Sequence, residues 1–456
     1  MAGGHRSVQN ALIIERRRGT LTADIVYKAA LACFYLMVFA KYVFSIPIPG
    51  AVLLLPYAAA AIAADRDELT VMALCTVPLY TSVPFVSAIG ICTAVFLIKF
   101  AKEIRPKKED LILLFILVWE LFHAFTIEFS VQEFVGIIVL YVFMVIAIRA
   151  YRPTEDYARI ARPVAWSTLF TCAMILLQLL AKNSFNMDKT WKSLLRLGSD
   201  YVDGETGPGA YLNPNTLGFF IVISVALLVQ LALTGRAKRR DHAVTAFLLV
   251  FGFFTSSRTF LICLFATGVL TVLSVRRSAG KRAKVLLISL ASAAAACLIF
   301  YLITPTTFTF FFNRVVNGGD NSRSMLFARY NEIIFTSPKF IFWGSGLNGV
   351  ASYQMSVIGQ VPHNGLQEIL FIWGFPGLAA YLAYFCAMFF RAAKSRARRT
   401  RLLNWIPLIV FAIKVQIGQL ITFTPVPLVI LLIYISVVNG LDSRDQKDQN
   451  MRETAK

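Results

Sequence analysis

Long apolar blocks separated by short polar segments follow one another along the whole chain. Blocks such as 285–304 and 364–390 are long enough to cross a hydrocarbon core, which takes about 20 helical residues. The blocks at 51–64, 69–83 and 243–256 are short for a full crossing. We therefore expect an all-α integral membrane protein with about 12–14 transmembrane helices. The helices are predicted at 24–46, 51–64, 69–83, 84–101, 110–128, 132–150, 163–181, 214–234, 243–256, 258–275, 285–304, 364–390, 402–423 and 425–440.

Composition agrees with this pattern and excludes several classes of protein. Of the 456 residues, 57% are apolar and 15% are charged, whereas soluble proteins are roughly 45–50% apolar and about 25% charged. A secreted enzyme, a soluble nucleotide-binding fold and a small disulfide scaffold are therefore excluded. All seven cysteines fall inside predicted spans, where cysteine packs as a small apolar residue, so we expect neither disulfides nor metal clusters from them.

The basic residues predict the orientation in the membrane. The chain carries 45 Lys and Arg against 25 Asp and Glu, a net charge of +20. The two longest loops, 182–212 and 305–363, hold only four basic residues each. Most of the other basic residues lie in the terminal segments and in the short segments that connect spans on the opposite side. Because basic residues favour the cytoplasmic side, we expect both termini in the cytoplasm and both long loops outside. The same bias explains most of the net charge, so we expect no nucleic-acid partner.

The N-terminal segment lacks the features of a cleavable leader. Arg16, Arg17 and Arg18 precede the first span, which we therefore interpret as an anchor. The predicted regions are a cytoplasmic segment (1–23), N-terminal transmembrane helices (24–181), an outer loop (182–212), central transmembrane helices (213–304), a large outer loop that carries active-site elements (305–363), C-terminal transmembrane helices (364–440) and a disordered cytoplasmic tail (441–456).

The large outer loop has structure of its own. Apolar residues spaced as on one helix face predict an amphipathic helix over Arg323–Phe335 that lies on the outer surface. Asp320, Asn321 and Ser322 offer N-caps, and Pro338 ends the helix. The glycine-rich segment 344–349 follows, either as a flexible return to the membrane or as part of a site.

Three predicted helices begin at the outer face with polar residues. Asn213-Pro214-Asn215 opens one, Ser256-Ser257-Arg258 the second, and Pro362-His363-Asn364 the third. Helix N-termini bind anions, and Arg binds phosphate in a fork geometry. If these ends converge, they form a site the size of a diphosphate; the alternative is three isolated caps.

His363 is one of four histidines and the best placed for chemistry. A helix N-terminus disfavours the imidazolium, so the neutral ring can accept a proton. Gln367 lies one turn later and is expected to orient a sugar or the ring, and Asn364 to cap the helix or contact substrate. The alternative is a structural histidine.

Other polar residues leave their roles open. Glu120, His123 and Glu128 form either a buried network or a second polar wall, and Lys414, Gln416 and Gln419 pose the same choice. The Asp-x-Asp pattern at 65–67 is either a metal site or a solvated cytoplasmic turn. The sequence has no other metal-ligand spacing and no P-loop, so we predict neither a metal nor ATP.

The sequence resembles the bacterial O-antigen polymerase and O-antigen ligase superfamily of membrane glycosyltransferases. Order and spacing agree over roughly 190–385. The matching segments are Leu212-Asn213-Pro214-Asn215-Thr216-Leu217-Gly218, Ser257-Arg258-Thr259, Ser322-Arg323, Pro338 with Trp343-Gly344-Ser345-Gly346, and His363-Asn364-Gly365-Leu366-Gln367-Glu368 with Gly374-Phe375-Pro376-Gly377.

The resemblance implies a reaction at the outer face of the bacterial inner membrane. The donor is an oligosaccharide on undecaprenyl diphosphate, and a hydroxyl of an acceptor glycan displaces the lipid diphosphate without metal, nucleotide or other cofactor. His363 becomes the catalytic proton acceptor, and Arg258 and Arg323 bind the diphosphate. Relatives often carry an Arg just before the Asn-Pro-Asn motif. This chain lacks it, and Arg196 or Lys192 is the candidate substitute. Further substrate contacts are expected from Asn213, Asn215, Asn364, Gln367 and Arg329.

Several functions remain open at this point. The first is a polymerase for O-antigen, capsule or exopolysaccharide repeat units, with a chain-length regulator and a flippase as potential partners in the same pathway. The second is a ligase that moves finished glycan to lipid A core or another acceptor. A flippase or transporter for the same lipid-linked glycans would use a basic cavity without chemistry but predicts paired repeats, and none is visible. A membrane scaffold would tolerate loss of His363, Arg258 and Arg323.

Overall fold

The computed structural model describes residues 3–123, 131–151, 157–186, 197–198, 212–274, 301–302, 305, 309, 312–313, 321–348, 362–394, 402–418, 420 and 424–439. These residues form helices and connecting segments, with no strand among them, as expected of an all-α integral membrane protein. The elements are α1 (Gly3–Val43), α2 (Gly50–Ala63), α3 (Arg66–Cys75), η1 (Val77–Leu79), α4 (Phe85–Phe100), η2 (Ala101–Glu103), α5 (Asp110–His123), α6 (Val131–Ala150), α7 (Ala158–Lys182), α9 (Pro214–Leu233), α10 (Arg239–Phe254), α11 (Arg258–Ser274), α14 (Asn321–Thr336), α15 (Pro338–Phe342), α17 (Gly365–Lys394), α18 (Leu402–Gln416) and α19 (Val426–Asn439).

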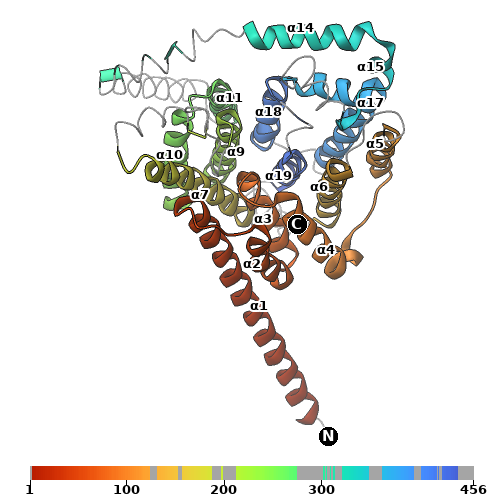
Figure 1. Ribbon diagram of the computed structural model, residues 1–456. Coiled ribbons are helices and arrows are strands. Elements are labelled where there is room, and N and C mark those ends of the chain that lie inside the picture. The colour runs from red at the N-terminus through yellow and green to blue at the C-terminus, as the bar shows by residue number, and fades with distance from the viewer. Residues whose placement is uncertain are drawn as a thin grey trace, which may run out of the picture.

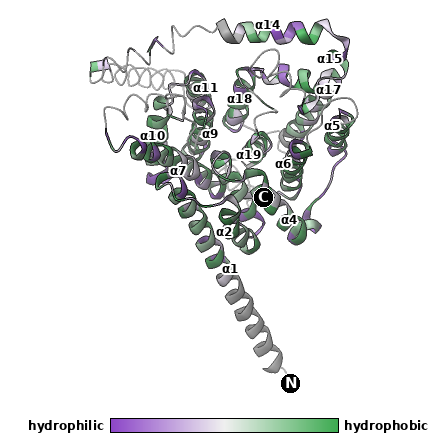
Figure 2. Cartoon of the chain, in the orientation of Figure 1, coloured by the Kyte–Doolittle hydropathy of each residue, from purple (hydrophilic) through white to green (hydrophobic). Residues whose placement is uncertain are grey.

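The helices are apolar along most of their length, as the hydropathy colouring in Figure 2 shows. In the described part of the chain, six helical stretches are long and apolar enough to cross a membrane. They are Thr22–Val43, Phe85–Glu103, Val131–Ala150, Ala158–Lys182, Pro214–Leu233 and Gly365–Arg391, and four shorter apolar helices are Gly50–Ala63, Arg258–Ser274, Leu402–Gln416 and Val426–Val438. The chain is therefore a multi-pass membrane protein.

Most predicted spans correspond to one helix each, with three differences, the first being that the span predicted at 402–423 is too long, because α18 ends at Gln416. The prediction of a helix over 69–83 is wrong, because α3 ends at Cys75 and the 3₁₀ turn η1 follows. Pro78 lies in the first turn of η1, and the Thr76 hydroxyl donates to the Ala73 carbonyl at 2.7 Å, so the α-helical ladder stops there. In addition, α1 begins at Gly3, well before the predicted span at 24–46. The predicted span 285–304 and the tail 441–456 lie outside the described residues.

The bundle is built around α9, most of whose residues are buried. It packs against α7, α10, α11 and α18, while α17 packs against α5, α15, α18 and α19. The predicted amphipathic helix of the large loop is confirmed as α14, which ends before Pro338. Figure 1 shows α14 running across the top of the bundle, at the opposite end from the N-terminus of α1.

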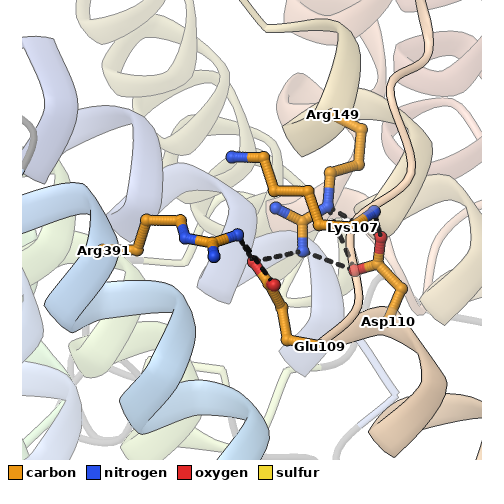
Figure 3. Close-up of polar contacts among 5 residues, drawn as sticks. All are labelled: Lys107, Glu109, Asp110, Arg149 and Arg391. Atoms are coloured by element: carbon orange, nitrogen blue, oxygen red, sulfur yellow. Dashed lines mark hydrogen bonds and ion pairs between the residues drawn. The ribbon is translucent and has the colours of Figure 1, made fainter.

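Ion pairs join helix ends at the side away from α14. Arg149 at the end of α6 donates from Nε to Asp110 at 2.9 Å, and Arg391 near the end of α17 donates to Glu109 at 2.6 Å (Figure 3). Burial, together with the charges of Arg149 and Arg391, lowers the pKa of the neighbouring Lys107. Because these salt bridges tie the start of α5 to the ends of α6 and α17, they fix one level of the bundle.

The Asp-x-Asp segment serves helix α3 in this structure. The Asp65 carboxylate accepts from the Glu68 N–H at 2.8 Å, and the Glu68 carboxylate accepts from the Asp65 N–H at 2.9 Å, which is a capping box. Arg66 pairs with Asp67 at 2.9 Å and with Glu103 at 2.8 Å. Asp65 thus caps α3, and Arg66 joins the start of α3 to η2 (Ala101–Glu103), which follows α4.

Candidate functional site

The start of α17 carries the candidate base. His363 is half-buried and lies immediately before the helix, between the buried Pro362 and Asn364. The Asn364 side-chain oxygen accepts from the N–H groups of Leu366 and Gln367, both at 3.1 Å. Asn364 is therefore a helix cap, and His363 lies at the positive end of the α17 dipole.

Gln367 fastens this first turn to α14. Its side-chain Nε2 donates to the Phe327 carbonyl at 2.8 Å and to the Asn331 Oδ1 at 2.7 Å. Its Oε1 is buried, and no donor among the described residues reaches it. Since a buried amide oxygen normally has a hydrogen-bond partner, this atom offers an acceptor to a donor such as a sugar hydroxyl.

A second joint attaches the start of α17 to the end of α18. The Asn364 Nδ2 donates to the backbone and side-chain oxygens of Gln416, both at 3.2 Å. The buried carboxylate of Glu368 accepts from the Leu420 N–H. A Cβ at Gly365 would lie 2.8 Å from the Leu420 Cβ, so only glycine allows this approach.

The Asn-Pro-Asn segment forms a third joint, between the starts of α9 and α11. Asn213 caps α9 by accepting from the Asn215 N–H at 2.9 Å. The Asn215 Oδ1 in turn accepts from the Ser257 hydroxyl at 2.8 Å, and Ser257 Oγ accepts from the Phe260 N–H at 3.2 Å. Arg258, the first residue of α11, is half-buried directly after this joint. The side-chain oxygens of both asparagines therefore hold the starts of α9 and α11, and their contact with substrate stays a prediction.

These joints lie at one level of the bundle. The Cys263 thiol on α11 is 3.8 Å from the Val410 carbonyl on α18, and the two helices pack together. Ser257 precedes Cys263 by six residues and Gln416 follows Val410 by six, which is about 9 Å along each helix axis. Because α11 and α18 run in opposite directions, Ser257 and Gln416 both lie toward the α14 side at the same depth. The helix starts beside Arg258 and His363 therefore share a layer.

The remaining predicted site residues lie either on α14 or outside the described residues. Leu326, Tyr330 and Ile334 form the buried face of α14, and Arg329 is exposed on it. Arg323 lies in the first turn of α14, but its side chain is outside the described residues, as is all of Arg196. The clamp on a diphosphate therefore stays a prediction for both arginines.

The glycine-rich segment is held firmly. The Leu347 N–H donates to the Glu120 carboxylate at 3.0 Å, and the Trp373 indole donates to its other oxygen at 2.7 Å. A ring nitrogen of His123 lies 3.0 Å from the Trp343 carbonyl. Glu120 and His123 thus join α5 to the segment after α15 and to α17. The two residues form a buried network here, and their contacts hold the described part of the glycine-rich segment in place. Glu128 lies outside the described residues.

Close backbone contact with α17 also holds the glycine-rich segment in place. Gly374 has φ 65° and ψ −171°, a conformation that interrupts α17 and favours glycine. A Cβ at Gly344 would lie 2.2 Å from the Ile372 carbonyl oxygen, and the Ser345 N–H donates to the Phe371 carbonyl at 2.8 Å. The segment after α15 therefore presses directly on the backbone of α17 near its bend.

Sequence reasoning missed Asn331 and the role of Gln416 as partners of the α17 start. Asn331 lies one turn after Phe327 on α14, at the edge of the apolar stripe. A polar residue at this position was the one indication in the sequence that α14 makes a polar contact with the bundle. Within the described residues, no group of three His, Cys, Asp or Glu side chains is arranged to hold a metal ion.

Neither protein-family models nor curated protein sequences give a match to this chain. The resemblance to O-antigen polymerases and ligases therefore rests on its motifs alone.

Proposed function

We propose that this chain is a polysaccharide polymerase of the bacterial inner membrane. It transfers a glycan from a polyprenyl-diphosphate donor onto a hydroxyl of another lipid-linked repeat unit. The layer that contains His363 and Arg258 faces outward, and both termini lie in the cytoplasm, in keeping with the distribution of basic residues. The products under this proposal are O-antigen, capsule or exopolysaccharide chains.

One observation carries the proposal: the starts of α9, α11 and α17 lie at one level of the bundle and are linked through neighbouring helices. The Asn215–Ser257 bond joins the first two, and the Asn364–Gln416 bond attaches the third to α18, which packs on α11. Positive ends of helix dipoles at one level favour an anion, and Arg258 adds a guanidinium beside them. A diphosphate group matches this arrangement of charge.

His363 acts as the general base in this proposal. The acceptor hydroxyl gives its proton to the neutral imidazole while its oxygen forms a bond to the anomeric carbon of the donor. The bond from that carbon to the diphosphate oxygen breaks, and its electron pair leaves with the lipid diphosphate. The buried Gln367 Oε1 accepts a hydrogen bond from a sugar hydroxyl and so orients the ring beside His363.

The cationic groups act on the leaving group. Negative charge grows on the diphosphate as its bond to the anomeric carbon breaks, so groups that bind this charge lower the barrier. Arg258 supplies this interaction from the start of α11 and Arg323 from the first turn of α14. Gln367 keeps α14 next to α17.

Purified chain in lipid vesicles, supplied only with lipid-linked repeat units, tests the proposal. Growth of glycan chains supports the polymerase, and loss of growth in His363→Ala supports the base. Transfer only after addition of lipid A core or another separate acceptor identifies a ligase. Movement of the lipid-linked glycan across the bilayer without a new glycosidic bond identifies a flippase, and absence of both activities identifies a scaffold.

A further inference from the structure

A basic cluster lies where α5 begins, at the end of the bundle away from α14. Its cations are Lys107, Arg149 and Arg391 (Figure 3). Its carboxylates are Glu109 and Asp110, so the cluster has one positive charge in excess. The proposed reaction takes place at the opposite end of the bundle and uses none of these side chains.

The two carboxylates fix both arginines in place. Asp110 accepts from the Arg149 Nε at 2.9 Å and from its Nη2 at 2.5 Å. Glu109 accepts from the Arg391 Nη1 at 2.6 Å and from the Arg149 Nη2 at 3.2 Å. The Arg149 side chain is buried, whereas that of Arg391 is 54% exposed. Because both guanidinium groups are already held in position, a ligand that binds them costs little side-chain entropy.

Lys107 contributes its backbone, but not its ammonium, to these contacts. Its N–H donates to the Asp110 carboxylate at 2.9 Å, and the described residues provide no hydrogen-bond or ion-pair partner for its Nζ. Figure 3 shows the side chain extending toward the two guanidinium groups. Partial burial lowers the pKa of Lys107, and the charges of Arg149 and Arg391 lower it further, against a smaller opposing effect of the carboxylates. Positive charge therefore remains in excess at this ammonium after the salt bridges have formed.

Exposed apolar side chains border the cluster on two helices. Leu111, the residue after Asp110 on α5, is 65% exposed. Phe390, the residue before Arg391 on α17, is 72% exposed. Leu114 continues the exposed apolar surface along α5. Since apolar side chains exposed on a membrane bundle face lipid tails, the cluster lies where hydrocarbon meets water.

Further cations extend the positive surface on the segment before α5. Arg105 and Lys108 are exposed on either side of Lys107. The distribution of basic residues favours the cytoplasm for this end of the bundle, and the cytoplasmic leaflet carries anionic phospholipids. Charge and apolar surface thus match the two parts of such a lipid, its phosphate and its acyl chains.

We propose that the basic cluster binds the phosphate group of an anionic phospholipid from the cytoplasmic leaflet. The Lys107 ammonium and the exposed part of the Arg391 guanidinium contact the phosphate, and the buried Arg149 adds its charge. The acyl chains lie along Leu111 and Leu114. The bound lipid is a partner of the protein at the end opposite His363, so this inference does not depend on the proposed reaction.

Tryptophan quenching by brominated lipids tests the site in membranes. Leu111→Trp puts a fluorophore beside the cluster, and the parent chain corrects for the native tryptophans. The full chain is placed in phosphatidylcholine vesicles that contain either brominated phosphatidylglycerol or brominated phosphatidylcholine. We expect phosphatidylglycerol to be preferred at this position by about fivefold or more, and Lys107→Gln in the same background to remove most of the preference. Equal quenching by both lipids without the Lys107 substitution overturns the proposal.

Lys238→Gln is the matched control for the loss of one charge. The Lys238 N–H also caps a helix through a carboxylate, that of Asp241 at 2.8 Å, at the same end of the bundle. This variant should keep the preference for phosphatidylglycerol. An equal loss in Lys238→Gln and Lys107→Gln shows a general attraction of the basic end and overturns the site. Should Lys107→Gln fail to fold, Lys107→Met supplies the same comparison, and Lys107→Arg should keep the preference.

Inorganic phosphate distinguishes a soluble anion from a lipid. The full chain in neutral detergent is heated with phosphatidylglycerol or with millimolar inorganic phosphate. We expect the lipid to raise the Tm and inorganic phosphate to leave it unchanged, with the effect of the lipid lost in Lys107→Gln. A rise with inorganic phosphate that also requires Lys107 identifies a soluble phosphate as the ligand and overturns the lipid assignment.

Discussion

The Gln367 side chain on α17 donates to the Phe327 carbonyl at 2.8 Å and to the Asn331 Oδ1 at 2.7 Å, both on α14. One amide thus ties the helix of the large outer loop to the turn that follows His363. Because the Nε2 of Gln367 faces two acceptors, its Oε1 is directed elsewhere and stays available. The side chain of Gln367 therefore has two roles: its Nε2 holds α14 in position, and its Oε1 is a hydrogen-bond acceptor in the helical turn that follows His363.

Asn331→Ala removes one of the two acceptors of Gln367. We expect a loss of about 1 kcal/mol in the docking of α14 and a severalfold fall in chain growth with little change in the amount of folded protein. Chain growth in vesicles measures the effect. Glu332→Gln, an exposed neighbour on α14, is the control. Equal activity of the two variants would show that α14 docking does not matter for the reaction.

Arg258→Lys keeps the charge at the start of α11 but removes the guanidinium fork. Since one ammonium cannot replace two parallel hydrogen bonds, we expect kcat/KM for the lipid-linked donor to fall about 10–100-fold. Arg159→Lys at the opposite end of the bundle, on α7, should behave as wild type. Near-normal kcat/KM in Arg258→Lys contradicts a bidentate contact with the diphosphate.

Gly344→Ala tests the close backbone contact between the segment after α15 and α17. The added Cβ would lie 2.2 Å from the Ile372 carbonyl oxygen, at a residue with φ 86°, so the backbone of one segment has to shift. We expect a loss of about 3 kcal/mol or more, seen as a lower Tm in detergent. Gly268→Ala is the matched control, because a Cβ there meets nothing within 4 Å. Similar Tm values for both variants would contradict the close contact.

Asp241 predicts a pH-dependent contribution to stability at the start of α10. Burial raises the pKa of this carboxyl, but the Lys238 N–H and the Arg162 guanidinium, at 2.8 and 3.0 Å, outweigh burial and hold the pKa below its ordinary value of 3.8. A lowered folded-state pKa stabilises the protein above the unfolded-state value, and this stabilisation is lost as the pH falls below about 4.

Asp241→Asn should therefore lower the free energy of unfolding by about 3 kcal/mol at pH 7, and this loss should shrink as the pH falls through the folded-state pKa of Asp241, which lies below 3.8. Thermal unfolding in detergent at pH 7 and at a pH below that pKa measures the difference. Asp24→Asn serves as the control, because Asp24 pairs with Lys28 on an exposed face of α1. A constant difference between wild type and Asp241→Asn at both pH values would exclude the ionised pair as its source.

The sequence predicted the helices well because a membrane span is a strong and local signal. Twenty apolar residues define a helix with almost no contribution from distant parts of the chain, as for α6, α9 and α17. The failure at 69–83 has the same origin, since apolar content concealed the interruption that Pro78 causes. Pro338 was interpreted correctly because it follows a clear amphipathic stripe.

The candidate site was only partly predictable, since it depends on contacts between distant residues. The cap at Asn213 follows from local rules and was expected, and a cap was one of the two roles left open for Asn364. The bonds from Asn215 to Ser257 and from Asn364 to Gln416 join residues 42 and 52 positions apart, and no spacing within one helix indicates them. Glu120 was left open for the same reason, because its partners Leu347 and Trp373 are more than 200 residues away.

Release of polyprenyl diphosphate is the decisive measurement for the proposed reaction, because it reports the bond that this reaction breaks. Purified chain in vesicles receives a lipid-linked repeat unit with a labelled lipid, and the freed diphosphate is counted against new glycosidic bonds. We expect one diphosphate per bond in wild type and in His242→Ala, and a loss of both in His363→Ala. Undiminished release from His363→Ala, or glycosidic bonds formed without released diphosphate, would contradict the proposed reaction.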